Sequence, residues 1–139
     1  MGRILAIDFG TKRTGIAVTD PLKIIASPLT TVRTHQLQPF LQTYITENEV
    51  EALVLGFPKR LNNTDTDTTA AVRRLESELK KKYPQIPVHL IDERFTSVLA
   101  KRSMIENGIK KKDRQDKSEV DMVSATIILQ SFMESSTRY

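Results

Sequence analysis

The chain has 139 residues, a formal net charge of +4, 39% hydrophobic residues and 27% charged residues. These values are typical of one globular domain that buries a core of its own. No apolar stretch approaches the ~18 residues of a membrane-spanning helix, and the N-terminus enters a predicted strand without the apolar region of a signal peptide. The composition therefore argues against a membrane anchor and favours a cytoplasmic protein.

The N-terminal part of the chain is predicted to form three strands joined by short connections. Apolar and β-branched residues run through Arg3–Asp8, Thr14–Thr19 and Ile24–Val32, as is typical of strands. Gly10 and Gly15 bracket the first turn. Connections this short favour an antiparallel meander.

The rest of the chain alternates helices with strands. Apolar residues recur at helical spacing from Leu37 to Ile45, with Pro39 in the first turn, where proline is tolerated. The remaining predicted elements are the strand Ala52–Gly56, the helix Thr68–Tyr83, the strand Val88–Asp92, the helix Thr96–Asn107 and the helix Ser118–Met133. Such alternation needs crossover connections and a parallel sheet. We expect an α/β fold with a five-stranded mixed sheet flanked by helices, one domain over residues 1–134 and a frayed tail over 135–139.

Three acidic residues lie beside apolar runs that are far apart in the chain. Asp8 closes the run Ile4–Ile7, Glu93 follows the strand Val88–Asp92, and Asp121 lies near the start of the last predicted helix. A carboxylate at the tip of a buried strand is costly to desolvate unless a cation or hydrogen-bond donors compensate it. The ligand crevice of such a sheet lies beyond its strand ends. Acids that converge there would make a metal site.

The residue types indicate which metal such a site would hold. Carboxylate oxygens suit Mg²⁺ or Mn²⁺. The chain has no Cys and only His35 and His89, so a zinc site has almost nothing to use. The expected cofactor is therefore Mg²⁺ or Mn²⁺, as one ion or as two.

Each acid also has a simpler structural role open to it. Asp8 can accept hydrogen bonds from the turn that follows it. Asp121 can be a favourable first-turn acid in a helix capped by Ser118. Adjacent strand residues face opposite sides of a sheet, so only one of Asp92 and Glu93 is expected to point into the crevice.

Basic residues gather near the same strand ends and before the last helix. A charge run is usually a solvated loop, but a phosphate-binding surface is an equal alternative because positive charge would surround the acids. Arg94 can instead pair with Asp92 or Asp20, and Lys12 and Arg13 can face solvent. The predicted nucleic-acid contacts are Lys12, Arg13, Arg94, Lys110, Lys111, Lys112 and Arg114.

Four strings of the sequence carry a family resemblance: AIDFGTKRTGIAVTD, LVLGFPKRLNNT, IDERFTS and VDMVSATIILQSF. In order and spacing they resemble the YqgF family of bacterial proteins, also called RuvX, over nearly the whole chain. One departure is the polar segment 62–67, where the family commonly has a glycine. The resemblance implies a ribonuclease H-like fold related to the RuvC junction resolvases. It also implies a metal-dependent acidic site at Asp8, Glu93 and Asp121.

The predicted activity is hydrolysis of phosphodiester bonds by metal-bound water. The resemblance implies processing of the 5′ end of pre-16S ribosomal RNA, with Holliday junction resolution on branched DNA as an alternative. A non-catalytic RNA-binding or ribosome-assembly role also stays open. The string DFGTKRTG resembles the first phosphate loop of sugar kinases and actin as well, but those proteins clamp ATP between two domains and 139 residues leave room for one. The expected partner is nucleic acid, bound by a monomer or a homodimer.

Overall fold

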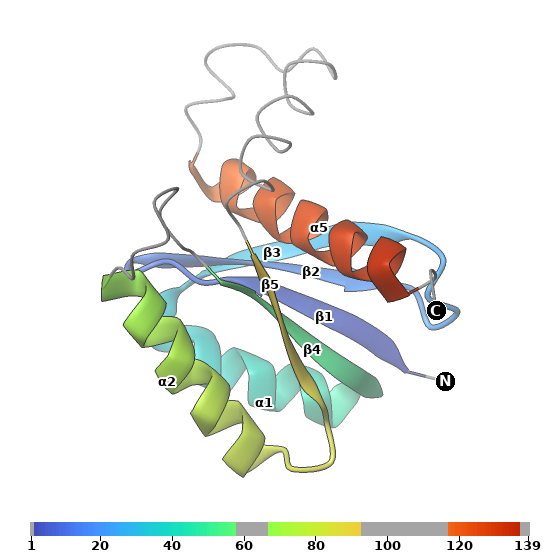
Figure 1. Cartoon of the computed structure of the whole chain (residues 1–139), viewed down its shortest axis with the longest axis horizontal. Coiled ribbons are helices and arrows are strands. Elements are labelled where there is room, and N and C mark those ends of the chain that lie inside the picture. The colour runs from blue at the N-terminus through green and yellow to red at the C-terminus, as the bar shows by residue number, and fades with distance from the viewer. Residues whose placement is uncertain (1, 58–66, 93–116, 137–139) are drawn as a thin grey trace.

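The structure is a computed structural model that describes residues 2–57, 67–92 and 117–136. One five-stranded sheet in the order β3-β2-β1-β4-β5 organises these residues (Figure 1). β1 (Arg3–Asp8) pairs antiparallel with β2 (Arg13–Thr19), which pairs antiparallel with β3 (Ala26–Arg33). β4 (Val50–Phe57) pairs parallel with β1, and β5 (Val88–Asp92) pairs parallel with β4. The predicted mixed sheet, a meander followed by parallel strands, is confirmed.

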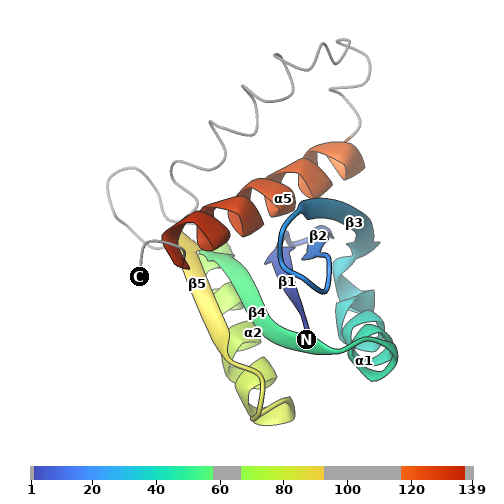
Figure 2. The same cartoon turned by 90° about the vertical axis from the view of Figure 1, so that its right-hand side faces the viewer.

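Helices cover both faces of this sheet (Figures 1 and 2). A short 3-10 helix, η1 (Thr34–Gln36), leads into α1 (Leu37–Glu47), which lies with α2 (Asp67–Lys82) on one face. On the other face lies α5 (Lys117–Ser136), which contacts every strand. It extends past the predicted domain boundary at residue 134. The predicted helix 96–107 and residues 137–139 lie outside the described part of the chain.

The turn between β2 and β3 explains why the third strand begins at Ala26 rather than at the predicted Ile24. The carboxylate of Asp20 accepts hydrogen bonds from the backbone N–H groups of Leu22, Ile24 and Ile25, over 3.2, 2.8 and 2.8 Å. These donors, that of Ile25 first, lower the pKa of Asp20 below its ordinary value of 3.8. Ile24 and Ile25 are therefore held in a turn instead of pairing with β2.

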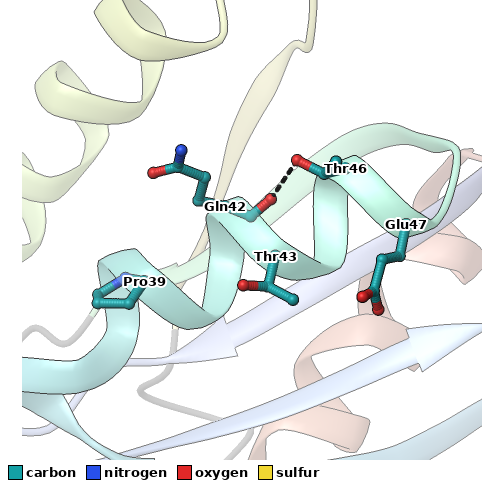
Figure 3. A pocket seen from close by; sticks show the side chains of 5 residues that line it. All are labelled: Pro39, Gln42, Thr43, Thr46 and Glu47. Carbon is teal, nitrogen blue, oxygen red and sulfur yellow. Dashed lines mark hydrogen bonds between the residues drawn. The ribbon is translucent and has the colours of Figure 1, made fainter.

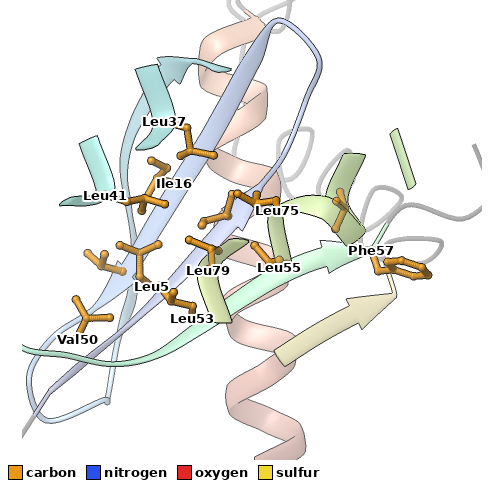
Figure 4. Close-up of a cluster of buried hydrophobic side chains, with 13 residues drawn as sticks. Leu5, Ile16, Leu37, Leu41, Val50, Leu53, Leu55, Phe57, Leu75 and Leu79 are labelled. Carbon is orange, nitrogen blue, oxygen red and sulfur yellow. The ribbon is translucent and has the colours of Figure 1, made fainter. Parts of the chain in front are cut away.

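Alternate strand residues face two separate cores. The core under α1 and α2 contains large side chains (Figure 4). The core under α5 is rich in alanine, which lets that helix lie close to the strands. Its buried members are Ile4, Ala6, Ala17, Ala52 and Val54 from the sheet, with Ala125, Ile128 and Leu129 from α5. None of the helices within the described ranges is long and apolar enough to cross a membrane.

We predict that Leu41→Ala lowers the free energy of unfolding by about 2–5 kcal/mol, because it leaves a cavity in a packed core. Leu41 is 0% exposed in the core under α1 and α2. The same substitution at Leu22, which is 58% exposed, should change stability by less than about 0.5 kcal/mol. Urea unfolding followed by circular dichroism measures both values. Equal losses in the two variants would contradict the packing of Leu41.

Candidate active site

Asp8 lies at the end of β1, on the sheet face that α5 covers. The residues two and four positions before it, Ala6 and Ile4, belong to the core under α5, and strand residues alternate between the two faces. In the antiparallel pairing of β1 with β2, Asp8 stands opposite Gly15. Directly opposed residues share a face, so Gly15 also faces α5.

Gly15 brings the last helix to this strand end. A Cβ atom built on Gly15 would overlap the backbone carbonyl of Asp121 and lie 3.0 Å from its Cβ. Only a residue without a side chain allows the helix to approach β2 this closely. Gly15 has Asp8 on the neighbouring strand and Asp121 on the helix above it. The two acids therefore lie near each other at one edge of the sheet, where β1 ends and β2 begins.

The carboxylate of Asp121 forms an ion pair with Arg13, at the start of β2. The Nε of Arg13 donates to Oδ2 of Asp121 over 3.2 Å, and the two side chains are 34% and 25% exposed. We predicted separate roles for these residues from sequence, and their pairing was missed.

The turn between β1 and β2 is held in place by Thr34, the first residue of η1. Its hydroxyl donates to the carbonyl of Gly10 over 2.6 Å, and its backbone N–H donates to the carbonyl of Lys12 over 3.0 Å. A further hydrogen bond of 3.0 Å joins the hydroxyls of Thr34 and Thr14. These contacts fix the backbone on both sides of Arg13. The sequence contains no motif that predicts them.

Asp92, at the end of β5, lies on the opposite face of the sheet from Asp8. It stands opposite Phe57 of β4, and Phe57 packs in the core under α1 and α2. The preceding residue, Ile91, packs against the core under α5. Asp92 therefore does not share a face with Asp8 and Asp121. Of the two adjacent acids at this strand end, it is the less suitable partner for them.

Several predicted site residues lie outside the described ranges. Lys12 is described and exposed beside Arg13. His89 of β5 is exposed and lies beside Phe132 of α5, with ring centroids 4.8 Å apart. The predicted residues outside the described ranges are Glu93, Arg94, Lys110, Lys111, Lys112 and Arg114.

The described residues supply two acids and one cation at this edge. Within residues 2–57, 67–92 and 117–136 no three His, Asp or Glu side chains form a metal-binding group. Asp8 and Asp121 offer hard oxygen donors, as Mg²⁺ and Mn²⁺ prefer. The guanidinium of Arg13 already places a positive charge against Asp121. The arrangement therefore fits a divalent cation, with the third predicted ligand, Glu93, outside the described part.

The cavity in Figure 3 is not part of this site. It has a volume of about 360 Å³, and its described lining residues all belong to α1: Pro39, Gln42, Thr43, Thr46 and Glu47. The hydroxyl of Thr46 is already bonded to the backbone carbonyl of Gln42, over 2.7 Å. These lining residues include no aromatic or basic group that would hold a nucleotide.

The strand order and the flanking helices define a ribonuclease H-like α/β domain. Two acids of the candidate site belong to it, Asp8 at the end of β1 and Asp121 in α5. Two solved structures share this architecture. One is the RuvC of T. thermophilus in complex with a Holliday junction substrate, with TM-score 0.61 and 16% identity over 99% of this chain and 96% of that one. The other is the fowlpox virus resolvase in complex with its Holliday junction DNA, with TM-score 0.60 and 12% identity over 96% and 98%. The predicted fold is confirmed.

The chain belongs to the RuvX family. Residues 2–135 match the family described as "RuvX: Holliday junction resolvase". A protein of Phocaeicola vulgatus is 55% identical over 135 residues, which cover 97% of both chains. One of Porphyromonas gingivalis is 51% identical over 138 residues, covering 99% of this chain and 100% of the other. Both carry the name "Putative pre-16S rRNA nuclease".

We predict that Gly15→Ala lowers the free energy of unfolding by about 1–3 kcal/mol, because the new methyl group overlaps the Asp121 backbone and forces α5 away from β2. Urea unfolding measures the loss of stability. The displaced helix should also weaken Mn²⁺ binding, which isothermal titration calorimetry measures. Wild-type stability together with wild-type Mn²⁺ affinity would contradict the close approach at Gly15.

Proposed function

We propose that this protein is a divalent-metal-dependent nuclease that trims the 5′ end of pre-16S ribosomal RNA. The observation that carries the proposal is the convergence of Asp8 and Asp121 at one sheet edge, through Gly15. Relatives at 51–55% identity that carry the pre-16S rRNA nuclease name support the substrate. The nearly complete coverage of both chains supports transfer of the whole activity rather than of one part.

Asp8, Asp121 and Glu93 are the residues that would hold Mg²⁺ or Mn²⁺. When bound, such an ion activates water for attack on a phosphodiester and stabilises charge on the leaving oxygen. The contribution of the chain is to hold the acids still. Asp8 is fixed by its place in β1, and Asp121 by the packing of α5 on the alanine-rich face of the sheet. No protein nucleophile is needed.

Arg13 has a second role in this proposal. Its side chain is 34% exposed, so its guanidinium can turn from Asp121 toward a phosphate that arrives at the strand end. A guanidinium pairs well with two phosphate oxygens. Exposed Lys12 adds charge beside it, and Arg94, Lys110, Lys111, Lys112 and Arg114 are proposed to extend the contact with the nucleic-acid backbone.

Resolution of a Holliday junction is the second candidate, because the family description names that activity. One experiment separates the candidates. The pure protein is incubated with ribosomal RNA precursor and with a four-way DNA junction, each with Mn²⁺ and with a chelator. Mn²⁺-dependent cutting of the RNA alone supports the proposal, and cutting of the junction alone supports the second candidate. Binding of RNA without any cutting would mean a non-catalytic assembly role.

We predict that Asp8→Asn lowers the cleavage rate by more than about 100-fold, because loss of a direct metal ligand costs more than the 10–100-fold typical of outer-shell partners. Affinity for RNA should stay equal or rise, since the change removes repulsion between a carboxylate and phosphate. Cleavage assays and filter binding measure the two quantities.

The matched control for Asp8→Asn is Asp20→Asn, at the opposite end of β2, which changes the charge equally outside the site. The amide oxygen of Asn can still accept from Ile24 and Ile25, so the turn should hold and the cleavage rate should stay within about threefold of the wild type. Wild-type turnover in Asp8→Asn would remove Asp8 from the site.

We predict that Arg13→Gln raises the affinity for Mn²⁺ severalfold, because the ion no longer competes with the guanidinium for the Asp121 carboxylate. Lys12→Gln makes the same charge change at the neighbouring exposed residue. It should raise Mn²⁺ affinity much less. Titration calorimetry without nucleic acid measures both variants. Equal affinities would show that Arg13 and the metal do not share Asp121.

A further inference from the structure

A second, smaller cavity lies on the other face of the same sheet edge. It has a volume of about 190 Å³ and lies between the start of α1 and the middle of α2. Phe9, which directly follows Asp8, forms part of its wall. The cavity therefore begins one residue beyond a proposed metal ligand. Its wall also includes Leu37, Gln38, Arg74, Leu75 and Glu78.

The inner wall of this cavity is apolar and well fixed. Leu37 and Leu75 are 2% and 5% exposed and belong to the core under α1 and α2. Phe9 packs against the same core and is half-buried. Thr34 bonds to the carbonyl of Gly10 and so holds the turn that carries Phe9. An aromatic ring beside leucine side chains offers a flat apolar surface to a planar ligand.

The outer wall carries hydrogen-bond donors and acceptors. Arg74 and Glu78 are exposed and lie four residues apart on one side of α2. The Nε2 of Gln38 donates to Oε2 of Glu78 over 3.2 Å, which positions that carboxylate. The side-chain amide oxygen of Gln38, Oε1, is buried and has no hydrogen-bond partner among the described residues. A small rotation of this amide would give the oxygen a partner if a ligand brought an N–H group into the cavity.

A nucleobase matches these walls, because it is apolar on its faces and polar along its edges. Arginine donates to O6 and N7 of guanine in the commonest specific base contact. The Glu78 carboxylate and the Gln38 carbonyl accept from N–H groups, which guanine presents at N1 and at its 2-amino group. Adenine carries an amino group where guanine has O6, so it cannot accept from Arg74 there. The cavity is also smaller than the ~300–1,000 Å³ of pockets for drug-sized ligands, which favours a single base over a larger ligand.

We propose that this cavity binds one unpaired guanine base of the substrate strand. The identity of the strand rests on the proposed nuclease function. Asp8 faces α5, and Phe9 lines a cavity on the face of α1 and α2. A backbone that crosses this strand end can place a phosphate beside the acids and a nearby base on Phe9. Proteins read single-stranded RNA by such stacking together with hydrogen bonds to base edges.

The test begins with base recognition by the full chain, without metal and without RNA. GMP, IMP and AMP are titrated while backbone amide signals are followed by heteronuclear NMR. All three carry the same ribose and phosphate, so differences among them report the base. GMP should shift the signals of Phe9, Gln38, Arg74 and Glu78. IMP, which lacks the 2-amino group, should bind roughly 2- to 10-fold more weakly, as expected for one lost hydrogen bond. AMP should bind more weakly than GMP.

Two variants with matched controls locate the contact. Glu78→Gln should reduce the preference for GMP over IMP, because a neutral amide oxygen accepts a hydrogen bond more weakly than a carboxylate. Arg74→Gln should weaken GMP binding severalfold. Glu76→Gln and Arg73→Gln make the same charge changes on the same helix outside the cavity. Glu76 pairs with Lys80 over 3.1 Å, and the Arg73 guanidinium lies 4.9 Å from the centroid of the Phe57 ring. Both controls should bind GMP as the wild type does. Thermal unfolding verifies that all four variants are folded.

Equal binding of GMP, IMP and AMP would overturn the proposal, because it would show that the cavity does not recognise the base. Shifts confined to Lys12 and Arg13 would overturn it as well, since they report the phosphate alone. Asp8→Asn leaves the cavity intact and should keep GMP binding. Failure of the nuclease proposal would therefore appear in the cleavage assay, and failure of the base site would appear in the GMP titration. If the protein both cleaves the RNA and prefers GMP, RNA with inosine in place of guanine beside the cut should be cleaved severalfold more slowly. The difference in cleavage rate between the two RNAs should be smaller in Glu78→Gln than in the wild type.

Discussion

The site depends on the close approach of α5 to β2 at Gly15. A helix that carries a functional acid must come near enough to the sheet for that acid to meet another one at a strand end. Gly15 removes the side chain that would block the Asp121 backbone, and alanines further along both elements continue the close packing. Packed helices lie about 8–10 Å apart and packed sheets about 10 Å apart when larger side chains separate them. The small residues under α5 therefore position Asp121, while the large side chains under α1 and α2 provide most of the buried core.

The sheet topology decides which residues meet at this edge. β1, β4 and β5 are parallel and end there, and the antiparallel β2 begins there. A short turn is then enough to return the chain to this edge, where Arg13 pairs with Asp121. Hydrogen bonds from Thr34, the first residue of η1, hold that turn in place. The two faces of the sheet carry different groups at this strand end. Asp8 faces α5 and the acid on it, and Phe9 lines a cavity between α1 and α2.

The strands and the two described acids could be predicted from sequence because their signals are local. Apolar runs mark β1 and β5, and helical spacing of apolar residues marks α5. The Arg13–Asp121 ion pair could not be predicted from sequence, because it joins side chains 108 positions apart and depends on how α5 lies across the sheet. The start of β3 was placed too early because the Asp20 carboxylate competes with strand pairing for the N–H groups of Ile24 and Ile25. Sequence left Asp92 and Glu93 as alternatives, and strand register places Asp92 on the face of the sheet opposite Asp8.

The ion pair of Arg13 and Asp121 shows how such a site can exist before a metal binds. Two carboxylates that meet at a half-buried edge repel each other, and a neighbouring cation offsets that cost. Either an arginine side chain or a divalent ion can supply the positive charge that offsets this repulsion. Under the proposed function, entry of the ion releases the guanidinium, and the released group is then available to a phosphate. Metal and substrate would thus favour each other's binding, and linkage requires the two effects to be equal in free energy. The basic residue next to the acids is then part of how the site is filled, as well as part of the surface that attracts nucleic acid.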